Sequence, residues 1–152
     1  MERRKFKRIV VTIALIGVFF TFGTGIKKAH AYIGNCAFAS IVAGFYQGVG
    51  SQQVALSFYY GNIDYVYTGW EYFDLAWSYA DDAAYYAYYS TNSFAWDAYL
   101  NADEAAYYLN LALNLAYASW YHYDVGYAYL SMYYGNVAAT YLAWVQYYAA
   151  YL

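Results

Sequence analysis

The sequence predicts an all-α protein, in which a signal peptide precedes a compact array or bundle of about four helices rich in tyrosine and alanine. Three observations predict this class. Alanine, the best helix former and a poor strand residue, is abundant. Proline, which breaks helices, is absent. Polar residues also recur at helical spacing over residues 71–85.

That helical spacing separates two faces. The polar face carries Glu71, Asp74, Ser78, Asp81 and Asp82. The opposite face carries Phe73, Ala76, Trp77, Ala80, Ala84 and Ala87. Tyrosine and tryptophan favour strands, and residues 109–117 alternate with a period of two, which keeps a strand alternative open. The two-faced stretch decides the interpretation for helices.

The expected helices cover residues 37–60, 70–89, 94–121 and 127–151. The expected breaks are Gly61-Asn62 together with Thr68-Gly69, then residues 90–93, then Asp124-Val125-Gly126. Asn92 or Ser93 is the expected N-cap of the third helix. Gly135-Asn136 is expected to kink or split the last helix.

Tryptophans also indicate an internal repeat. Trp96, Trp120 and Trp144 recur every 24 residues, and Trp70 precedes the first of them by 26. A fixed period of this length is typical of stacked units that bury their apolar faces on one another. Chance self-similarity in a chain so rich in tyrosine and alanine is the alternative.

Residues 1–31 differ from the rest of the chain. A basic head at Arg3–Arg8 is followed by an apolar run over residues 9–22 and by Ala29-His30-Ala31. These are the parts of a secretory signal peptide, with cleavage expected after Ala31. Residues 32–152 then form one tyrosine-rich domain, secreted or held at the cell surface through a Sec-type signal. Retention of the segment as a membrane anchor is the alternative.

Cleavage would change the charge of the chain. All seven Lys and Arg residues precede residue 29, whereas nine of the ten acidic residues follow residue 31. Nucleic acid is therefore excluded as an expected partner, because phosphate binding depends on Lys and Arg. The mature chain is also not expected to insert into a membrane, because its uncharged stretches are not strongly aliphatic and tyrosine prefers the membrane interface.

Cys36 is the single cysteine. An exported protein meets an oxidising compartment, and Cys36 has no intramolecular partner. Two interpretations stay open: a small buried residue, or an intermolecular disulfide.

The acidic stripe offers the one candidate metal site. Glu71, Asp74, Asp81 and Asp82 bring like charges together, and Ca²⁺ takes carboxylate oxygens. A solvated acidic face that maintains solubility is the alternative, because the sequence has no EF-hand loop. No other cofactor is expected.

Catalytic motifs are missing, so no enzyme is expected. The 26 tyrosines exceed what one small core can bury, and exposed aromatic residues are typical of interaction surfaces. The expected interaction residues are Trp70, Trp96, Trp120, Trp144, Tyr85, Tyr86, Tyr107, Tyr108, Tyr133 and Tyr134. Ser40, Gly44 and Gly48 are expected to share one small-residue face for close helix approach.

The sequence thus favours a non-enzymatic structural protein of the cell surface or extracellular matrix. Its expected partner is itself or another envelope or matrix protein, bound through aromatic helix faces. A monomeric helical-repeat module that binds carbohydrate, peptide or protein on a Tyr/Trp surface is the second hypothesis. A small membrane-active protein is the third.

Overall fold

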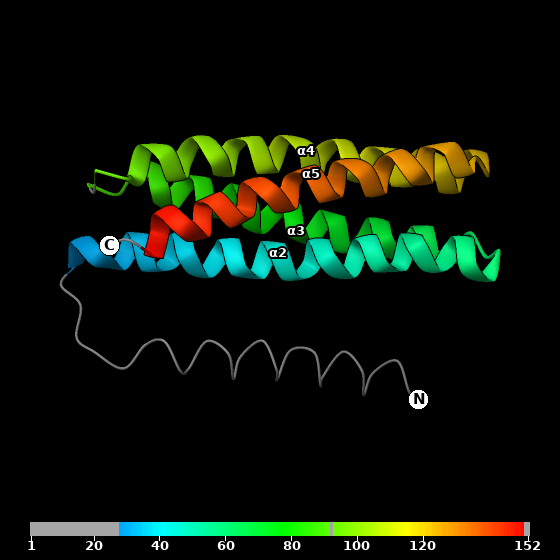
Figure 1. The fold of residues 1–152 in the computed structure, drawn as a ribbon, viewed down its shortest axis with the longest axis horizontal. Coiled ribbons are helices and arrows are strands. Elements are labelled where there is room, and N and C mark those ends of the chain that lie inside the picture. Colours follow the sequence, from blue (N-terminus) through cyan, green and yellow to red (C-terminus); the bar gives the residue numbers. More distant parts are fainter. Residues whose placement is uncertain (1–27, 92, 151–152) are drawn as a thin grey trace, which may run out of the picture.

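The computed structural model describes residues 28–91 and 93–150, with side chains from residue 34 onward. These residues form α2 (Lys28–Tyr60), α3 (Asp64–Tyr88), α4 (Ala95–His122) and α5 (Val125–Ala150). The helices run up, down, up and down in one bundle (Figure 1). Each helix packs on two neighbours, with α5 closing the ring against α2. The all-α prediction is confirmed, since the described part contains no strand.

The core is a seam of residues spaced alternately three and four positions apart, which is the heptad spacing of coiled coils. In α2 the seam consists of Cys36, Ser40, Ala43, Gln47, Gly50, Val54 and Ser57. In α3 it consists of Val66, Gly69, Phe73, Ala76, Ala80, Ala83 and Ala87. In α4 it consists of Ala95, Ala98, Ala102, Ala105, Leu109, Ala112, Ala116 and Ser119. In α5 it consists of Ala128, Ser131, Gly135, Ala138, Leu142, Val145 and Ala149.

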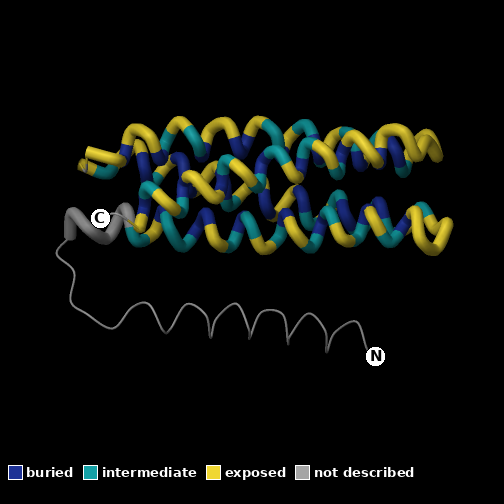
Figure 2. The backbone as a smooth tube through the Cα atoms, viewed as in Figure 1, coloured by how far each residue is buried: buried dark blue, intermediate teal, exposed yellow. Residues whose placement is uncertain are grey.

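Most seam residues are small, so the helices approach one another closely. The buried stripe runs along the inner side of every helix (Figure 2). A Cβ atom added at Gly69 would lie 3.1 Å from the Gly50 carbonyl oxygen and 2.7 Å from a methyl carbon of Val54. The α2 and α3 backbones are therefore nearly in contact at this level.

Phe73 is the one aromatic side chain that is fully buried among the described residues. Its ring fills the space left by two glycines on other helices. A Cβ atom at Gly50 of α2 would lie 2.9 Å from the ring, and one at Gly135 of α5 would lie 2.8 Å from it. The bundle therefore closes around Phe73 because both opposing positions lack a side chain.

These contacts correct two predicted breaks. Thr68 and Gly69 lie inside α3, which begins at Asp64 rather than at residue 70. Gly135 and Asn136 lie inside an uninterrupted α5. Both glycines serve close packing rather than a turn, so a break was the wrong interpretation.

The predicted breaks at Gly61-Asn62 and between α3 and α4 are confirmed. The predicted break at residues 124–126 is too long, because α5 begins at Val125 and only Asp124 of these residues lies outside a helix. Gly61 (φ 63°) and Tyr123 (φ 57°) adopt the left-handed conformation in the two tight turns. Position 94 is the N-cap of α4, where Phe94 makes no side-chain capping bond. Because α4 begins at Ala95, Ser93 lies one position too early to cap it, and Asn92 lies outside the described residues.

The two helical hairpins are related by an offset of 62 residues. Every seam position from 36 to 87 has a seam partner 62 residues later. The turns match as well: Asn62 Oδ1 accepts from the Asp64 amide at 2.9 Å, and Asp124 Oδ1 accepts from the Gly126 amide at 2.7 Å. Identical pairs include Tyr46/Tyr108, Ser57/Ser119, Tyr59/Tyr121, Tyr65/Tyr127, Tyr67/Tyr129, Tyr72/Tyr134, Tyr79/Tyr141, Tyr85/Tyr147 and Tyr86/Tyr148.

The structural repeat is thus a hairpin, and a unit of about 24 residues is not confirmed. Trp96 and Trp120 lie at opposite ends of the same helix, while Trp144 lies within the next helix. The tryptophan spacing therefore relates positions that are not equivalent in the bundle.

The predicted signal segment lies almost entirely outside the described residues. Helix α2 begins at Lys28, before the expected cleavage point at Ala31. The described seam begins at Cys36, so cleavage there would leave it complete. None of the described helices combines the length and apolar character needed to cross a membrane.

Candidate functional site

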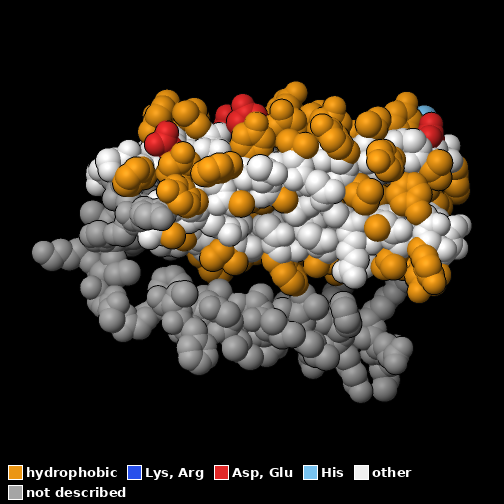
Figure 3. Space-filling model, in the orientation of Figure 1, with side chains coloured by type: hydrophobic (Ala, Val, Ile, Leu, Met, Phe, Trp, Pro, Cys, Tyr) orange, Lys and Arg blue, Asp and Glu red, His pale blue; other side chains and the backbone are white. Residues whose placement is uncertain are grey.

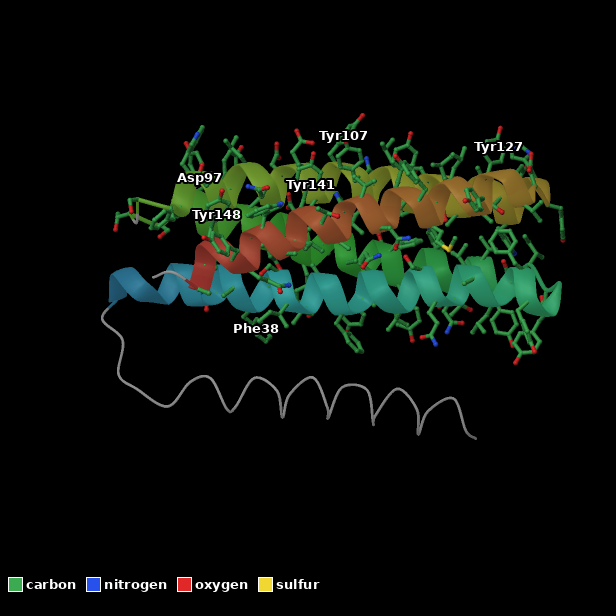
Figure 4. The ribbon with its side chains drawn as sticks, in the orientation of Figure 1. Phe38, Asp97, Tyr107, Tyr127, Tyr141 and Tyr148 are labelled. Carbon is green, nitrogen blue, oxygen red and sulfur yellow. The ribbon has the colours of Figure 1, made fainter. Side chains whose placement is uncertain are left out.

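In each predicted interaction pair of adjacent tyrosines, one side chain is exposed to solvent and the other packs at a helix interface. Tyr107 and Tyr133 are exposed, whereas the residues that follow them, Tyr108 and Tyr134, are half-buried. Figure 4 shows Tyr107 pointing away from the bundle. Tyr85 and Tyr86 divide in the same way. In each predicted interaction pair, one phenol is therefore available to a partner and the other packs within the molecule.

The half-buried tyrosines form two equivalent three-ring stacks. Tyr108 lies between Tyr134 and Tyr141, with ring centroids 6.0 and 5.5 Å away. Partial burial, Tyr141 and Glu104 raise the pKa of Tyr108 above its ordinary value. The stack joins α4 to α5 through rings that lie nearly parallel.

The second stack joins α2 to α3. Tyr46 lies between Tyr72 and Tyr79, with centroids 6.1 and 5.8 Å away. Partial burial, with Tyr79 and Tyr72 nearby, raises the pKa of Tyr46. Each of these three rings lies 62 residues before its counterpart in the other stack. Each stack therefore connects the two helices of one hairpin.

A third aromatic cluster joins α3 to α4 and contains two of the predicted tryptophans. Tyr67 lies 5.2 Å from Trp70 and 5.0 Å from Trp120, between ring centroids. Tyr117 lies 5.9 Å from Trp70 and 6.0 Å from Trp120. Neither tryptophan is fully buried. The structure therefore brings Trp70 and Trp120 into one cluster, although they are 50 residues apart in sequence.

This cluster borders a hollow lined by Asp64, Tyr67, Thr68 and Trp120, with a volume of about 350 Å³. It lies between the first turns of α3 and the last turn of α4. Sequence reasoning missed Asp64, Tyr67 and Thr68 because it treated residues 61–69 as a connection. We name this feature the α3–α4 hollow.

The other two predicted tryptophans lie apart from that hollow. Trp96 is exposed near the start of α4, with its ring 5.2 Å from Tyr99. Trp144 is exposed on α5 between Tyr147 and Tyr148, at 5.7 and 6.2 Å. The predicted interaction residues therefore form several separate surfaces rather than one.

The predicted metal ligands are exposed along α3. Glu71, Asp74, Asp81 and Asp82 all face solvent. Among the residues that the structure describes, no group of three or more His, Cys, Asp or Glu side chains is placed to hold a metal ion.

Cys36 lies in the core. Its side chain is fully buried, and burial raises the pKa of its thiol to about 12. Because the thiolate is the reactive form, this thiol is protected in the folded chain. The structure therefore favours the small buried residue over the intermolecular disulfide, which would require the bundle to open.

Small residues on α2 do not share one face. Ser40 is buried in the seam, Gly44 lies near the Gln146 amide of α5, and Gly48 is exposed. A spacing of four drifts around a helix of 3.6 residues per turn, so these three positions separate. The predicted small-residue face is therefore wrong.

The chain matches no protein-family model, no curated protein and no solved structure.

Proposed function

We propose that the chain is an exported, non-enzymatic structural protein of the cell surface or extracellular matrix that assembles with further copies of itself. The observation that carries the proposal is a second heptad stripe on α2, directed away from the core. This outer stripe consists of Phe38, Ile41, Phe45, Gly48, Gln52, Ala55 and Tyr59. Figure 4 shows Phe38 pointing away from the bundle.

The outer stripe has the spacing of a coiled-coil seam but no partner helix in the described chain. Its members are spaced alternately three and four residues apart, and none is charged. Ile41 is 53% exposed, and Tyr59 is 81% exposed. Gly48 and Ala55 leave room for close approach of another backbone. A second copy of α2 would supply matching residues and bury this apolar surface.

The distribution of charge also favours association through α2. Residues 34–60 of α2 and all of α5 carry no charged residue. The acidic residues after residue 31 lie on α3, on α4 and in the α4–α5 turn. In the view of Figure 3 the acidic side chains lie along the α4 edge, and none lies over α2. Contact through α2 therefore keeps the like charges of two copies apart.

Export rests on the N-terminal sequence alone, through its basic head, apolar run and Ala29-His30-Ala31 end. The mature surface suits an extracellular assembly, because burial and aromatic contacts do not depend on ion pairs.

Sedimentation velocity over a hundredfold range of protein concentration tests self-association. The unmodified protein is expected to form larger species as its concentration rises. Ile41→Glu is expected to shift the distribution toward monomer, because association would bury an unpaired carboxylate. Leu75→Glu is the matched control, since Leu75 is similarly exposed but lies on acidic α3.

Circular dichroism of both variants establishes that the bundle remains folded. A protein that stays monomeric at every concentration contradicts the assembly proposal. Equal weakening by Ile41→Glu and Leu75→Glu contradicts the assignment to the outer stripe.

A further inference from the structure

We infer that the α3–α4 hollow binds a small organic cation carrying a methylated ammonium group. The inference does not depend on self-association. Four residues line the hollow: Tyr67 and Trp120 contribute aromatic rings, Asp64 contributes a carboxylate and Thr68 contributes a hydroxyl.

The aromatic part of the lining suits a cation. The Tyr67 and Trp120 centroids lie 5.0 Å apart with an interplanar angle of 53°, so the two rings are tilted rather than stacked face to face. Aromatic faces attract cations through the ring quadrupole, and Trp is the strongest of the aromatic side chains in this respect. At this centroid distance the two rings contact each other, so a cation can lie against them on the side of the hollow but not between them.

The polar part of the lining offers acceptors. Thr68 Oγ1 donates to the Asp64 carbonyl oxygen at 3.2 Å, so its proton is already engaged. The Asp64 carboxylate is exposed, and neither of its oxygens accepts a hydrogen bond within the described chain. A ligand of positive charge complements both groups, whereas an anion would be repelled.

The start of α3 does not provide an anion site. The amide of Asp64 donates to Asn62 Oδ1 at 2.9 Å. The amides of Tyr65 and Val66 donate to the carbonyl oxygens of Asn62 and Ile63. The helix N-terminal donors that would attract an anion are therefore occupied.

The electrostatic field of the protein also favours the binding of a cation. No Lys or Arg occurs between residues 29 and 152, whereas acidic residues are spread over α3 and α4. The negative charge on α3 and α4, which flank the hollow, raises the local concentration of cations. The hollow of about 350 Å³ is also large enough for a trimethylammonium group.

Titration with choline, followed by NMR of the ¹⁵N-labelled full chain, tests the inference. The indole N–H signal of Trp120, assigned from Trp120→Phe, is expected to shift and saturate. The neutral isostere 3,3-dimethylbutan-1-ol is expected to produce no saturable shift. The isostere has the same shape as choline without its charge, so it separates cation binding from apolar contact.

Two pairs of variants localise the site. Asp64→Asn is expected to weaken choline binding about two- to fivefold, as is typical of an exposed ion pair. Asp82→Asn removes the same charge from the exposed face of α3 and is expected to leave binding unchanged. Trp120→Phe removes that indole signal, so its binding is followed through the backbone amide of Thr68, and it is expected to be weakened. Trp144→Phe, in the exposed cluster on α5, is expected to leave binding unchanged.

Three results would overturn the inference. The first is a Trp120 signal that does not respond to choline. The second is an equal response to choline and its neutral isostere. The third is equal weakening by Asp64→Asn and Asp82→Asn, which would mean general attraction to a negative surface. Self-association is measured separately by sedimentation, so either proposal can fail while the other stands.

Discussion

Gly135→Ala tests whether Phe73 closes the bundle core as the structure places it. A Cβ atom at Gly135 would lie 2.8 Å from Cε1 and 3.0 Å from Cζ of Phe73, and 3.1 Å from Ser51 Oγ. Distances this short require the buried ring or a helix to shift. Overpacking of this kind costs about 1–3 kcal/mol. Alanine in place of glycine inside a helix contributes about 0.5–1 kcal/mol in the opposite direction.

The expected net effect is a loss of about 0–2.5 kcal/mol in the free energy of unfolding, with a central value of about 1 kcal/mol. Urea unfolding at a fixed protein concentration, followed by circular dichroism, measures it. Gly48→Ala is the matched control, because a Cβ atom there would have nothing within 4 Å. Gly48 belongs to the outer stripe, so all variants are measured at a concentration at which sedimentation finds only monomer. This control is expected to stabilise the chain by about 0.5–1 kcal/mol through helix propensity alone.

A double-mutant cycle isolates the contact with the ring. In a Phe73→Leu background the smaller side chain leaves space, so Gly135→Ala is expected to be neutral or stabilising. The coupling between the two positions is expected to exceed about 1 kcal/mol. If Gly135→Ala stabilised the unmodified chain as much as Gly48→Ala does, Phe73 would not fill the space that Gly135 leaves.

Two further substitutions test buried groups by urea unfolding. Because burial raises the pKa of Cys36 to about 12, the unfolded chain releases its thiol proton at lower pH than the folded chain, and stability falls as pH rises. The unfolded thiol titrates near pH 8.5, so the free energy of unfolding is expected to fall by about 1.4 kcal/mol per pH unit above about pH 9. Cys36→Ala is expected to flatten this dependence on pH. Identical pH profiles for the two proteins would contradict burial of the Cys36 thiol. The Ser131 hydroxyl is buried and has no hydrogen-bond partner among the residues that the structure describes. Ser131→Ala is therefore expected to raise the free energy of unfolding by about 1 kcal/mol, and a loss of stability would indicate that the hydroxyl has a partner.

Helices were predictable because their polar residues repeat at the helical period. Glu71, Asp74 and Asp81 face solvent as expected, while Phe73 and Ala76 of the opposite face are buried. What the pattern did not reveal is the heptad seam. Its members are mostly alanine, glycine and serine, whose apolar character does not exceed that of the flanking tyrosines. Side-chain size rather than polarity marks the inside of this bundle.

The same reason explains the errors at glycine. Gly69 and Gly135 resemble turn residues in a sequence, but a glycine inside a helix also permits contact with another helix or with a large ring. Placing a break at Gly69 removed the first turn of α3 from the expected helix. Asp64 and Thr68 were then assigned to a connection, so the α3–α4 hollow was not predicted. Trp120 was among the predicted interaction residues, but its partners across the hollow were not.

The contact between Phe73 and Gly135 has a consequence for how the two hairpins recognise each other, because these residues occupy equivalent positions 62 apart. If the first hairpin paired with another first hairpin, two phenyl rings would compete for the same space. If the second paired with itself, two glycines would face each other and leave a void. Only a first hairpin paired with a second hairpin places one phenyl ring opposite one glycine, which fills this space without a clash or a void. The two halves of this chain, similar as they are, have thereby become partners that fit each other better than either fits itself.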